Sequence, residues 1–494
     1  MVFSSAIFLF AFLPLTLVGY YLIDRRFKNI FLLIASLLFY AWGEPRFVFV
    51  MAGSILVNHV FALLIDRNLT RAEQLIQHST AEAYRSRAKS WLCLMVVFNL
   101  SLFFVYKYLN FTIANANRVI GLFGMEPLGQ SSIALPIGIS FFTFQAMSYV
   151  FDVYRRKGQV QKNPLNTMLY VSMFPQLIAG PIVRYETVAE EIKSRKETLD
   201  DFVKGIKRFI VGLSKKAILA NSVAIIADKA FSYTNFLELS ALMAWLGAAA
   251  YTLQIFFDFS GYSDMAIGLG LMFGFHFDEN FNYPYIAKSV SEFWRRWHIS
   301  LSTWFRDYVY IPLGGSRVGS ESRHIFNLFV VWMLTGLWHG AAWNFVAWGL
   351  LYFAVLVFEK KTKIPQRLRA AAARYAYRAV TIFIVVIGWV LFRANGLKNA
   401  LRYLGCMFGL MGNQPVDATA AFLLRQSSFL LAIAVLFCTP IVPKLNGVLE
   451  QRLTGKAVAT ARETVKLLLY MAAFTVAVSF TVSSTYNPFI YFNF

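Results

Sequence analysis

The 494-residue chain is too apolar to fold as a soluble protein. Hydrophobic residues make up 58% of it and charged residues only 15%, whereas soluble domains average about 25% charged residues. Several apolar runs approach the roughly 20 residues that a helix needs to cross a bilayer. The short alternating segments of a membrane barrel are not visible in the sequence, so we predict an all-α polytopic membrane protein.

The formal net charge of +21 indicates a membrane partner and not a nucleic acid. Lysine and arginine gather in cytoplasmic loops of membrane proteins, and no soluble basic module is visible that could bind nucleic acid. An anionic polymer or a lipid head group is a further partner that the positive charge allows. Basic residues follow the apolar run 2–22 and do not precede it, which favours a first membrane helix over a cleavable signal peptide.

The first half of the chain alternates apolar runs, at about 2–23, 29–43, 47–65, 91–106 and 132–151, with polar loops. His59 lies alone in the third run, and we interpret it as a helix-contact residue. The next segment, 165–183, contains Pro175 and Pro181 and has basic residues on both sides. It is either a re-entrant segment shielded by protein or an ordinary span kinked by proline.

Residues 202–228 are amphipathic, which predicts a helix lying in the membrane interface. The following run, 239–257, leads to Asp258 and Asp264. These acids either cap a helix and form a turn or position the basic residues downstream.

Four later apolar runs are separated by polar loops that are mostly basic, as cytoplasmic loops are. These runs lie at about 343–358, 379–393, 427–443 and 466–482. In total we predict about 11 transmembrane helices plus re-entrant and interfacial helices, forming a single domain over 1–494.

The stretch 294–344 places cations, aromatic residues and two histidines within an otherwise membrane-like sequence, which is a functional hypothesis by default. The chain between His298 and His339 is long enough for both side chains to meet. A buried imidazole stays neutral and can accept a proton, as the attack of a hydroxyl on an acyl thioester requires. We predict both histidines as catalytic, with a structural role as the alternative. Gly336 and Gly340 would allow close approach to His339.

The remaining candidates would bind the acyl donor or line a tunnel. The arginines could hold donor phosphates or extend to the membrane interface, and the tryptophans could be interface anchors or tunnel walls. These donor- or tunnel-binding candidates are Trp294, Arg295, Arg296, Trp297, Trp304, Arg306, Asp307 and Trp338. No metal-ligand spacing, nucleophile elbow or Walker A loop is present in the sequence, so no metal is predicted.

Several motifs in order resemble the membrane-bound O-acyltransferase family, most closely its bacterial alginate O-acetylase branch. The resemblance is carried by Trp294–Tyr308 (WRRWHISLSTWFRDY), Ile311–Gly315 (IPLGG), Gly336–Gly340 (GLWHG), Leu135–Phe141, Ile178–Pro181 and Asp258–Gly268. It is strongest up to about residue 395, and the motif-bearing core covers about 130–395.

This resemblance implies a ring of helices around a central tunnel, with His339 as the principal catalytic histidine and His298 as the second. It also implies an acyl donor loaded from the cytoplasm, either acetyl-coenzyme A or a carrier thioester, and no bound cofactor. The acetyl group would cross the bacterial cytoplasmic (inner) membrane for O-acetylation of a cell-surface polysaccharide, such as alginate, another exopolysaccharide or peptidoglycan. A separate extracytoplasmic transferase would often complete the transfer.

Two other functions stay open from the residues. A transporter or flippase for an anionic polymer or lipid-linked precursor is supported by the positive charge and the broken helices, although no matching interrupted segments are visible in two halves of the chain. A non-catalytic scaffold for a synthase complex is the third possibility.

Overall fold

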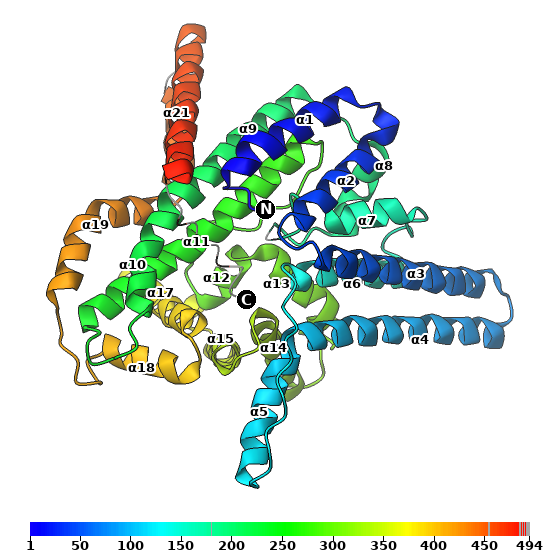
Figure 1. Ribbon diagram of the computed structural model, residues 1–494, viewed down its shortest axis with the longest axis horizontal. Coiled ribbons are helices and arrows are strands. Elements are labelled where there is room, and N and C mark those ends of the chain that lie inside the picture. The colour runs from blue at the N-terminus through cyan, green and yellow to red at the C-terminus, as the bar shows by residue number, and fades with distance from the viewer. Residues whose placement is uncertain (179, 453–454, 484–485, 487, 489, 491–494) are drawn as a thin grey trace. The chain divides into compact units, whose positions relative to one another are not determined.

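The computed structural model describes residues 1–494 except 179, 453–454, 484–485, 487, 489 and 491–494, and every regular element in the described part is a helix (Figure 1). The predicted all-α class is therefore confirmed. Eight described helices are long and apolar enough to cross a membrane, against the predicted number of about 11. The apolar runs at 2–23, 29–43 and 132–151 form shorter helices. These eight are 47–74, 78–122, 199–231, 241–272, 343–362, 371–393, 418–437 and 457–483.

The chain forms two compact units. The first contains Met1–Gly205 and Leu269–Asp278, and the second contains Ile206–Gly268 and Glu279–Phe494. The single domain expected over 1–494 stays a prediction, since two compact units can belong to one domain or to two.

The first unit is built around helices that pair through buried polar groups. Asn58 of α3 and Asn99 of α4 exchange side-chain amide hydrogen bonds of 3.0 and 2.8 Å, and these two helices lie side by side (Figure 1). His59 Nδ1 lies 2.9 Å from Thr167 Oγ1 of α7, so its predicted helix-contact role is confirmed. The elements are η1 (Phe8–Phe12), α1 (Leu13–Leu22), η2 (Arg25–Phe27), α2 (Lys28–Ala41), α3 (Phe47–Gln74), α4 (His78–Phe103), η3 (Phe104–Tyr108), α5 (Leu109–Leu122), α6 (Ile139–Tyr154), α7 (Pro164–Ser172) and α8 (Tyr185–Ser194).

The segment 165–183 is interrupted. Helix α7 has only 9 residues and ends at Ser172, and non-helical backbone with buried side chains follows it, including Phe174 and Leu177. A helix of this length cannot span a bilayer, so the structure agrees with the re-entrant interpretation and not with a proline-kinked span.

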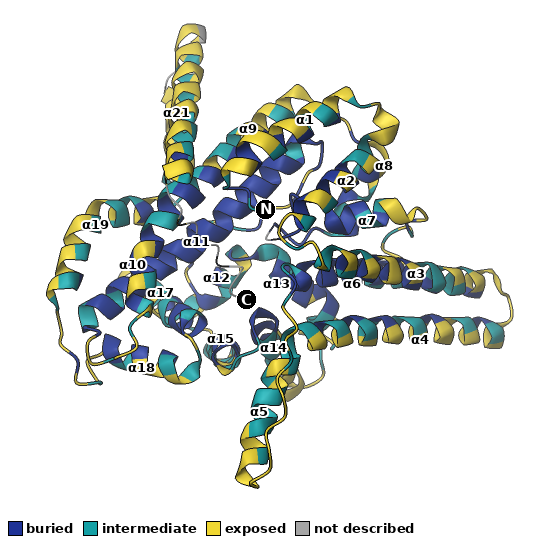
Figure 2. Ribbon diagram, viewed as in Figure 1, coloured by how far each residue is buried: buried dark blue, intermediate teal, exposed yellow. Residues whose placement is uncertain are grey.

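The second unit holds most of α11 and all the later helices. In α11, 83% of the most apolar window is buried, against 6% in α21, so α11 lies in the core and α21 presents its side chains outward (Figure 2). Helix α9 (Leu199–Ser214) begins in the first unit. The elements that follow are η4 (Lys215–Ala220), α10 (Asn221–Phe231), α11 (Ala241–Met272), η5 (Pro284–Ile286), α12 (Val290–Arg296), α13 (Ile299–Phe305), η6 (Arg306–Tyr310), α14 (Glu321–His339), α15 (Trp343–Thr362), α16 (Ile364–Arg367), α17 (Ala371–Arg393), α18 (Leu397–Met407), α19 (Ala418–Phe437), α20 (Ile441–Arg452) and α21 (Lys456–Ser483).

Residues 199–231 form one continuous helix that is long and apolar enough to span a membrane, so the interfacial helix expected over 202–228 stays a prediction. The prediction for the two acids of α11 is wrong. Asp258 and Asp264 lie inside α11, so they neither cap a helix nor position downstream arginines.

Instead, the two carboxylates neutralise cations that precede them in the chain. Asp258 pairs with Lys216 at 2.6 Å, while Asp264 pairs with Arg208 and Lys215, each at 2.6 Å. We call these five residues the charged seam. It explains how the helix 199–231 packs against α11 with three of its cations at the contact.

Candidate active site

The short helix α12 begins in a fully bonded turn. The Ser289 side chain accepts a hydrogen bond from the Glu292 amide at 3.1 Å, which is a typical helix cap. The buried carboxylate of Glu359, from α15, accepts bonds from the amides of Val290 at 2.7 Å and Ser291 at 2.9 Å. These contacts satisfy donors that a helix start leaves open, so α12 is held firmly against α15.

His298 follows α12 in a left-handed backbone conformation, with φ 46° and ψ 56°. Such a conformation is uncommon for residues other than glycine and requires support from its surroundings. The buried Asn280 supplies it: its carbonyl accepts from the Ile299 amide at 3.0 Å, and its side chain accepts from the Ser300 amide at 3.1 Å. Asn280 therefore holds the turn that carries His298.

The tryptophans at the start of the stretch 294–344 form an aromatic cluster. The Trp294 ring lies 5.1 Å from Trp332, 5.4 Å from Trp348 and 4.8 Å from Tyr352. The Trp297 ring lies 4.8 Å from Trp389. These rings come from α12, α14, α15 and α17, so the cluster joins four helices.

His339 is the last residue of α14, and its ring faces the same cluster. It lies 5.0 Å from the rings of both Trp348 and Phe392. Helices α14 and α15 approach closely through glycines: a Cβ on Gly336 would lie 2.5 Å from the Phe345 carbonyl oxygen. The predicted close approach at Gly336 is therefore confirmed, and it sets the position of His339.

Both histidines contact Trp338. The ring of His298 lies 6.3 Å from the Trp338 ring, and the ring of His339 lies 5.0 Å from it. Both imidazoles are buried, with 2% and 9% of their surface exposed. Burial lowers the pKa of His298 to about 3, so this side chain is neutral near pH 7.

The charged candidates lie apart from this aromatic setting. Arg295 and Arg306 are exposed, and Arg306 pairs with its neighbour Asp307 at 2.7 Å. Arg296 pairs with Glu292 at 2.9 Å. Trp304 packs against Phe305 and Tyr308. The structure thus places Trp338 against both histidines and Trp294 and Trp297 in the aromatic cluster, whereas the arginines face outward or pair locally.

Sequence reasoning missed several residues of the site. Among the described residues, Trp294 Nε1, Trp348 Nε1 and the Tyr352 hydroxyl are buried and have no hydrogen-bond partner. Trp348 and Tyr352 lie in an ordinary apolar run, so only the three-dimensional contact with His339 and Trp294 distinguishes them. The roles of Asn280 and Glu359 could not be predicted from the sequence either, because both residues lie outside the motifs named above.

This arrangement suits the transfer of an uncharged group. Buried imidazoles can accept a proton, and buried donors without partners can bind a carbonyl oxygen that gains negative charge. Aromatic walls can exclude water, which would otherwise compete as a nucleophile. No group of three potential metal ligands occurs among the described residues.

Comparison with known proteins gives consistent matches. The model of the membrane-bound O-acyltransferase family matches residues 80–400. The "Probable alginate O-acetylase AlgI" of Pseudomonas putida is 39% identical over 508 residues, covering 100% of both chains. The "Peptidoglycan O-acetyltransferase" of Helicobacter pylori is 35% identical, covering 83% of this chain and 80% of its own. The "Teichoic acid D-alanyltransferase" of Bacillus subtilis is 34% identical, covering 46% of this chain and 60% of its own.

Proposed function

The chain belongs to the membrane-bound O-acyltransferase family, and from this premise we propose that it transfers acetyl groups to a cell-surface polysaccharide. Membership makes it a multi-pass membrane O-acyltransferase. The acetyl group and the polysaccharide acceptor are proposed because two of the similar proteins, both matching over most of this chain, are named for O-acetylation of alginate and of peptidoglycan. We place the enzyme in the bacterial cytoplasmic membrane.

In the mechanism that we propose, His339 is the general base. It takes the proton of the acceptor hydroxyl while the hydroxyl oxygen bonds to the acyl carbon of a thioester. The carbon–sulfur bond then breaks, and His339 returns the proton to the leaving thiolate. The single observation that supports this role best is the position of His339, a buried imidazole at a helix end against Trp348 and Phe392.

The second histidine and the unpartnered donors would assist this step. His298 reaches the same Trp338 ring and is held in place by Asn280, so we assign it to positioning the acceptor or relaying its proton. Tyr352 and Trp348 have donors available for the acyl oxygen as it becomes negative. These roles explain why polar atoms lie buried in an aromatic cluster.

We further propose that the donor is a cytoplasmic thioester, acetyl-coenzyme A or a carrier-bound acetyl group, and that no cofactor stays bound. The acetylated acceptor would carry the group to the other side of the membrane. A separate extracytoplasmic transferase would then break this ester and move the acetyl group to a hydroxyl of the polysaccharide.

The test is the O-acetyl content of surface polysaccharide from cells that carry wild-type or His339→Ala protein at equal membrane abundance. We expect His339→Ala to reduce acetylation by about a hundredfold or more. The control is His78→Ala, because His78 is exposed. Normal acetylation across all glycan fractions in the His339 variant would reject the proposal, and flux of intact substrate without acyl chemistry would favour a transporter.

A further inference from the structure

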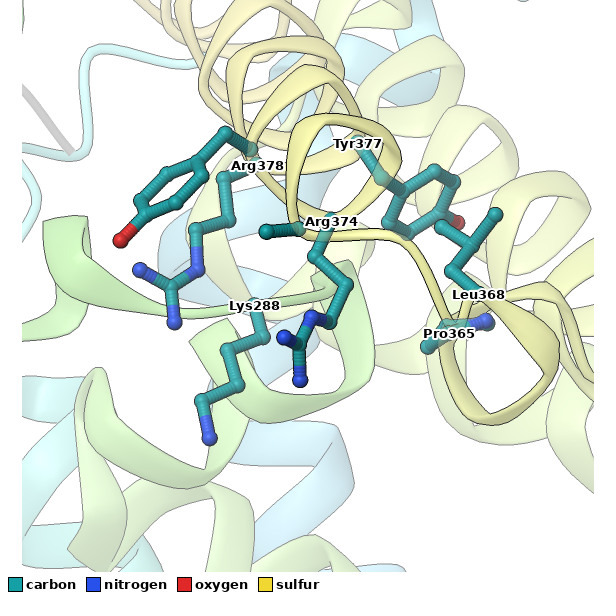
Figure 3. Close-up of a pocket in the computed structure, with 8 residues that line it drawn as sticks. Lys288, Pro365, Leu368, Arg374, Tyr377 and Arg378 are labelled. Carbon is teal, nitrogen blue, oxygen red and sulfur yellow. The ribbon is translucent and has the colours of Figure 1, made fainter.

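A basic pocket lies in the second unit, outside the histidine cluster. It has a volume of about 270 Å³ and lies between Lys288, just before α12, and the segment that contains α16 and the start of α17 (Figure 3). The lining residues are Lys288, Pro365, Leu368, Ala371, Arg374, Tyr375, Tyr377 and Arg378. Three of these are cations, and no acidic side chain lines the pocket.

The positive charge of the pocket is not neutralised by its own walls. Neither Arg374 nor Arg378 forms an ion pair within the described residues. The charge of Lys288 acts on the carboxylate of Glu292, but that carboxylate is already paired with Arg296. Figure 3 shows the three basic side chains extending toward the same side of the pocket. An anion bound there would meet three cations at once.

Arg378 carries the most specific signal. Its guanidinium lies 5.2 Å from the ring of Tyr375, which limits its orientation. Its Nε is buried and has no hydrogen-bond acceptor in the described part of the chain. A buried donor on a charged group is costly to leave without a partner, and a solvated basic surface would not bury it. The missing acceptor therefore indicates a ligand.

We propose that this pocket binds a phosphate ester. Arginine presents donors in a planar fork that matches phosphate oxygens, and charge-assisted bonds of this kind are strong. A phosphate fits better than a carboxylate because several cations share one small cavity. The ester belongs either to a water-soluble molecule such as a nucleotide-bearing thiol or to an anionic lipid head group.

The pocket is connected to the turn that carries the candidate active site. The Tyr377 hydroxyl, on the pocket wall, donates to Glu359 at 3.0 Å. The same carboxylate accepts the amides of Val290 and Ser291 at the start of α12. A bound ester would thus contact the elements that fix α12, and a donor of acyl groups carrying phosphates would be held beside the helix that precedes His298.

The experiment measures binding of tritiated coenzyme A to the full chain in nanodiscs made only of neutral lipid. The variants are Arg378→Gln and Arg374→Gln, and the matched control is Arg369→Gln, an exposed arginine between α16 and α17 that does not line the pocket. We expect either pocket variant to weaken binding by about tenfold to a hundredfold, while the control binds as the wild type does. Arg374 is exposed, so its variant stays informative if Arg378→Gln fails to fold.

A second arm identifies the source of the ester. If coenzyme A does not bind, the amount of phosphatidylglycerol that copurifies with each variant from mixed bilayers is measured. Loss of this lipid in the pocket variants but not in the control supports the lipid head group. If neither ligand distinguishes the pocket variants from Arg369→Gln, the proposal is wrong. Neither measurement requires turnover, so the result is independent of acyl transfer.

Discussion

The charged seam and the histidine cluster both bury ionisable groups in the second unit, but they surround them differently. In the seam, Asp258 and Asp264 lie opposite three cations at 2.6 Å each. In the cluster, the contacts of His298 and His339 include the rings of Phe281, Trp338, Trp348 and Phe392. In the seam, buried carboxylates are neutralised by lysine and arginine side chains. In the cluster, buried imidazoles are surrounded by aromatic rings.

This difference separates structural from chemical roles. An ion pair that is buried can be replaced by apolar residues of similar volume with little loss of stability. A catalytic imidazole cannot be replaced by an apolar residue in this way, because the replacement could not accept and return a proton. We therefore expect seam variants to change stability and cluster variants to change activity.

The largest effect on stability should come from removing one partner of a buried ion pair in the seam. Lys216→Met leaves Asp258 buried without its cation, which should lower the free energy of unfolding by about 3–5 kcal/mol. The double variant Lys216→Met with Asp258→Leu should recover most of this loss. Denaturant unfolding in detergent measures both. A double variant as unstable as the single one would mean that the pair does more than neutralise charge.

The next effect should come from the glycine contact that positions His339. A Cβ on Gly349 would lie 2.5 Å from the Trp332 carbonyl oxygen, so Gly349→Ala must separate α14 from α15. We expect a loss of about 1–3 kcal/mol in stability together with a loss of acyl transfer, measured on the same preparation. Gly53→Ala is the control, because nothing lies within 4 Å of the added atom there. Full activity in Gly349→Ala would show that the α14–α15 spacing does not set the site.

The helical class was predictable from the sequence, and His298 and His339 could be selected as candidates, because apolar runs and isolated ionisable residues are visible without a structure. Sequence reasoning failed at Asp258 and Asp264, since their partners Arg208, Lys215 and Lys216 precede them by many residues and meet them only after folding. The interfacial helix predicted over 202–228 rests on cations taken as solvated, whereas Asp258 and Asp264 neutralise three of these cations.

The sequence indicated site residues only where they lie close together in one motif. Trp338 contacts both histidines and is adjacent to one of them in the sequence, yet Tyr352 and Asn280 are ordinary residues until tertiary contacts bring them to the site. The interrupted segment after α7 was foreseeable from its prolines, because proline ends helices by a local mechanism. Contacts between distant segments carry no such local signal.

A smaller effect concerns pH. Burial lowers the pKa of His298 to about 3, whereas an unfolded histidine titrates near 6.5. Below that pH the unfolded chain binds a proton that the folded chain does not, so stability falls as pH decreases from 6.5 toward 3. We expect a loss of about 2 kcal/mol between pH 7 and 5, measured by unfolding at both values.

His298→Gln removes this titration and should reduce the loss of stability at pH 5. The control is His78→Gln, which replaces an exposed histidine outside the cluster. Equal pH dependence in wild type and His298→Gln would mean that His298 is not the group whose burial matters. That result would also weaken the contrast between a cluster that holds neutral imidazoles and a seam that holds charges.

The smallest effect on stability should come from Tyr352→Phe. This variant also tests most directly whether the cluster differs from the seam in having a chemical role. The Tyr352 hydroxyl has no hydrogen-bond partner among the described residues, so its removal should leave the thermal midpoint unchanged or slightly raised. If the hydroxyl stabilises the acyl oxygen, the rate of acyl transfer should fall by about tenfold or more. The measurement is the rate per folded protein at saturating donor.

Tyr251→Phe is the matched control. The Tyr251 hydroxyl is also buried without a partner in the described residues, but its ring packs against Phe231 and away from the histidine contacts given above. A loss of rate in Tyr352→Phe alone would show that the unpartnered donors of the cluster act in the reaction. If both variants transfer acyl groups at the wild-type rate, the Tyr352 hydroxyl has no role in the reaction. The proposed chemistry would then rest on the histidines alone.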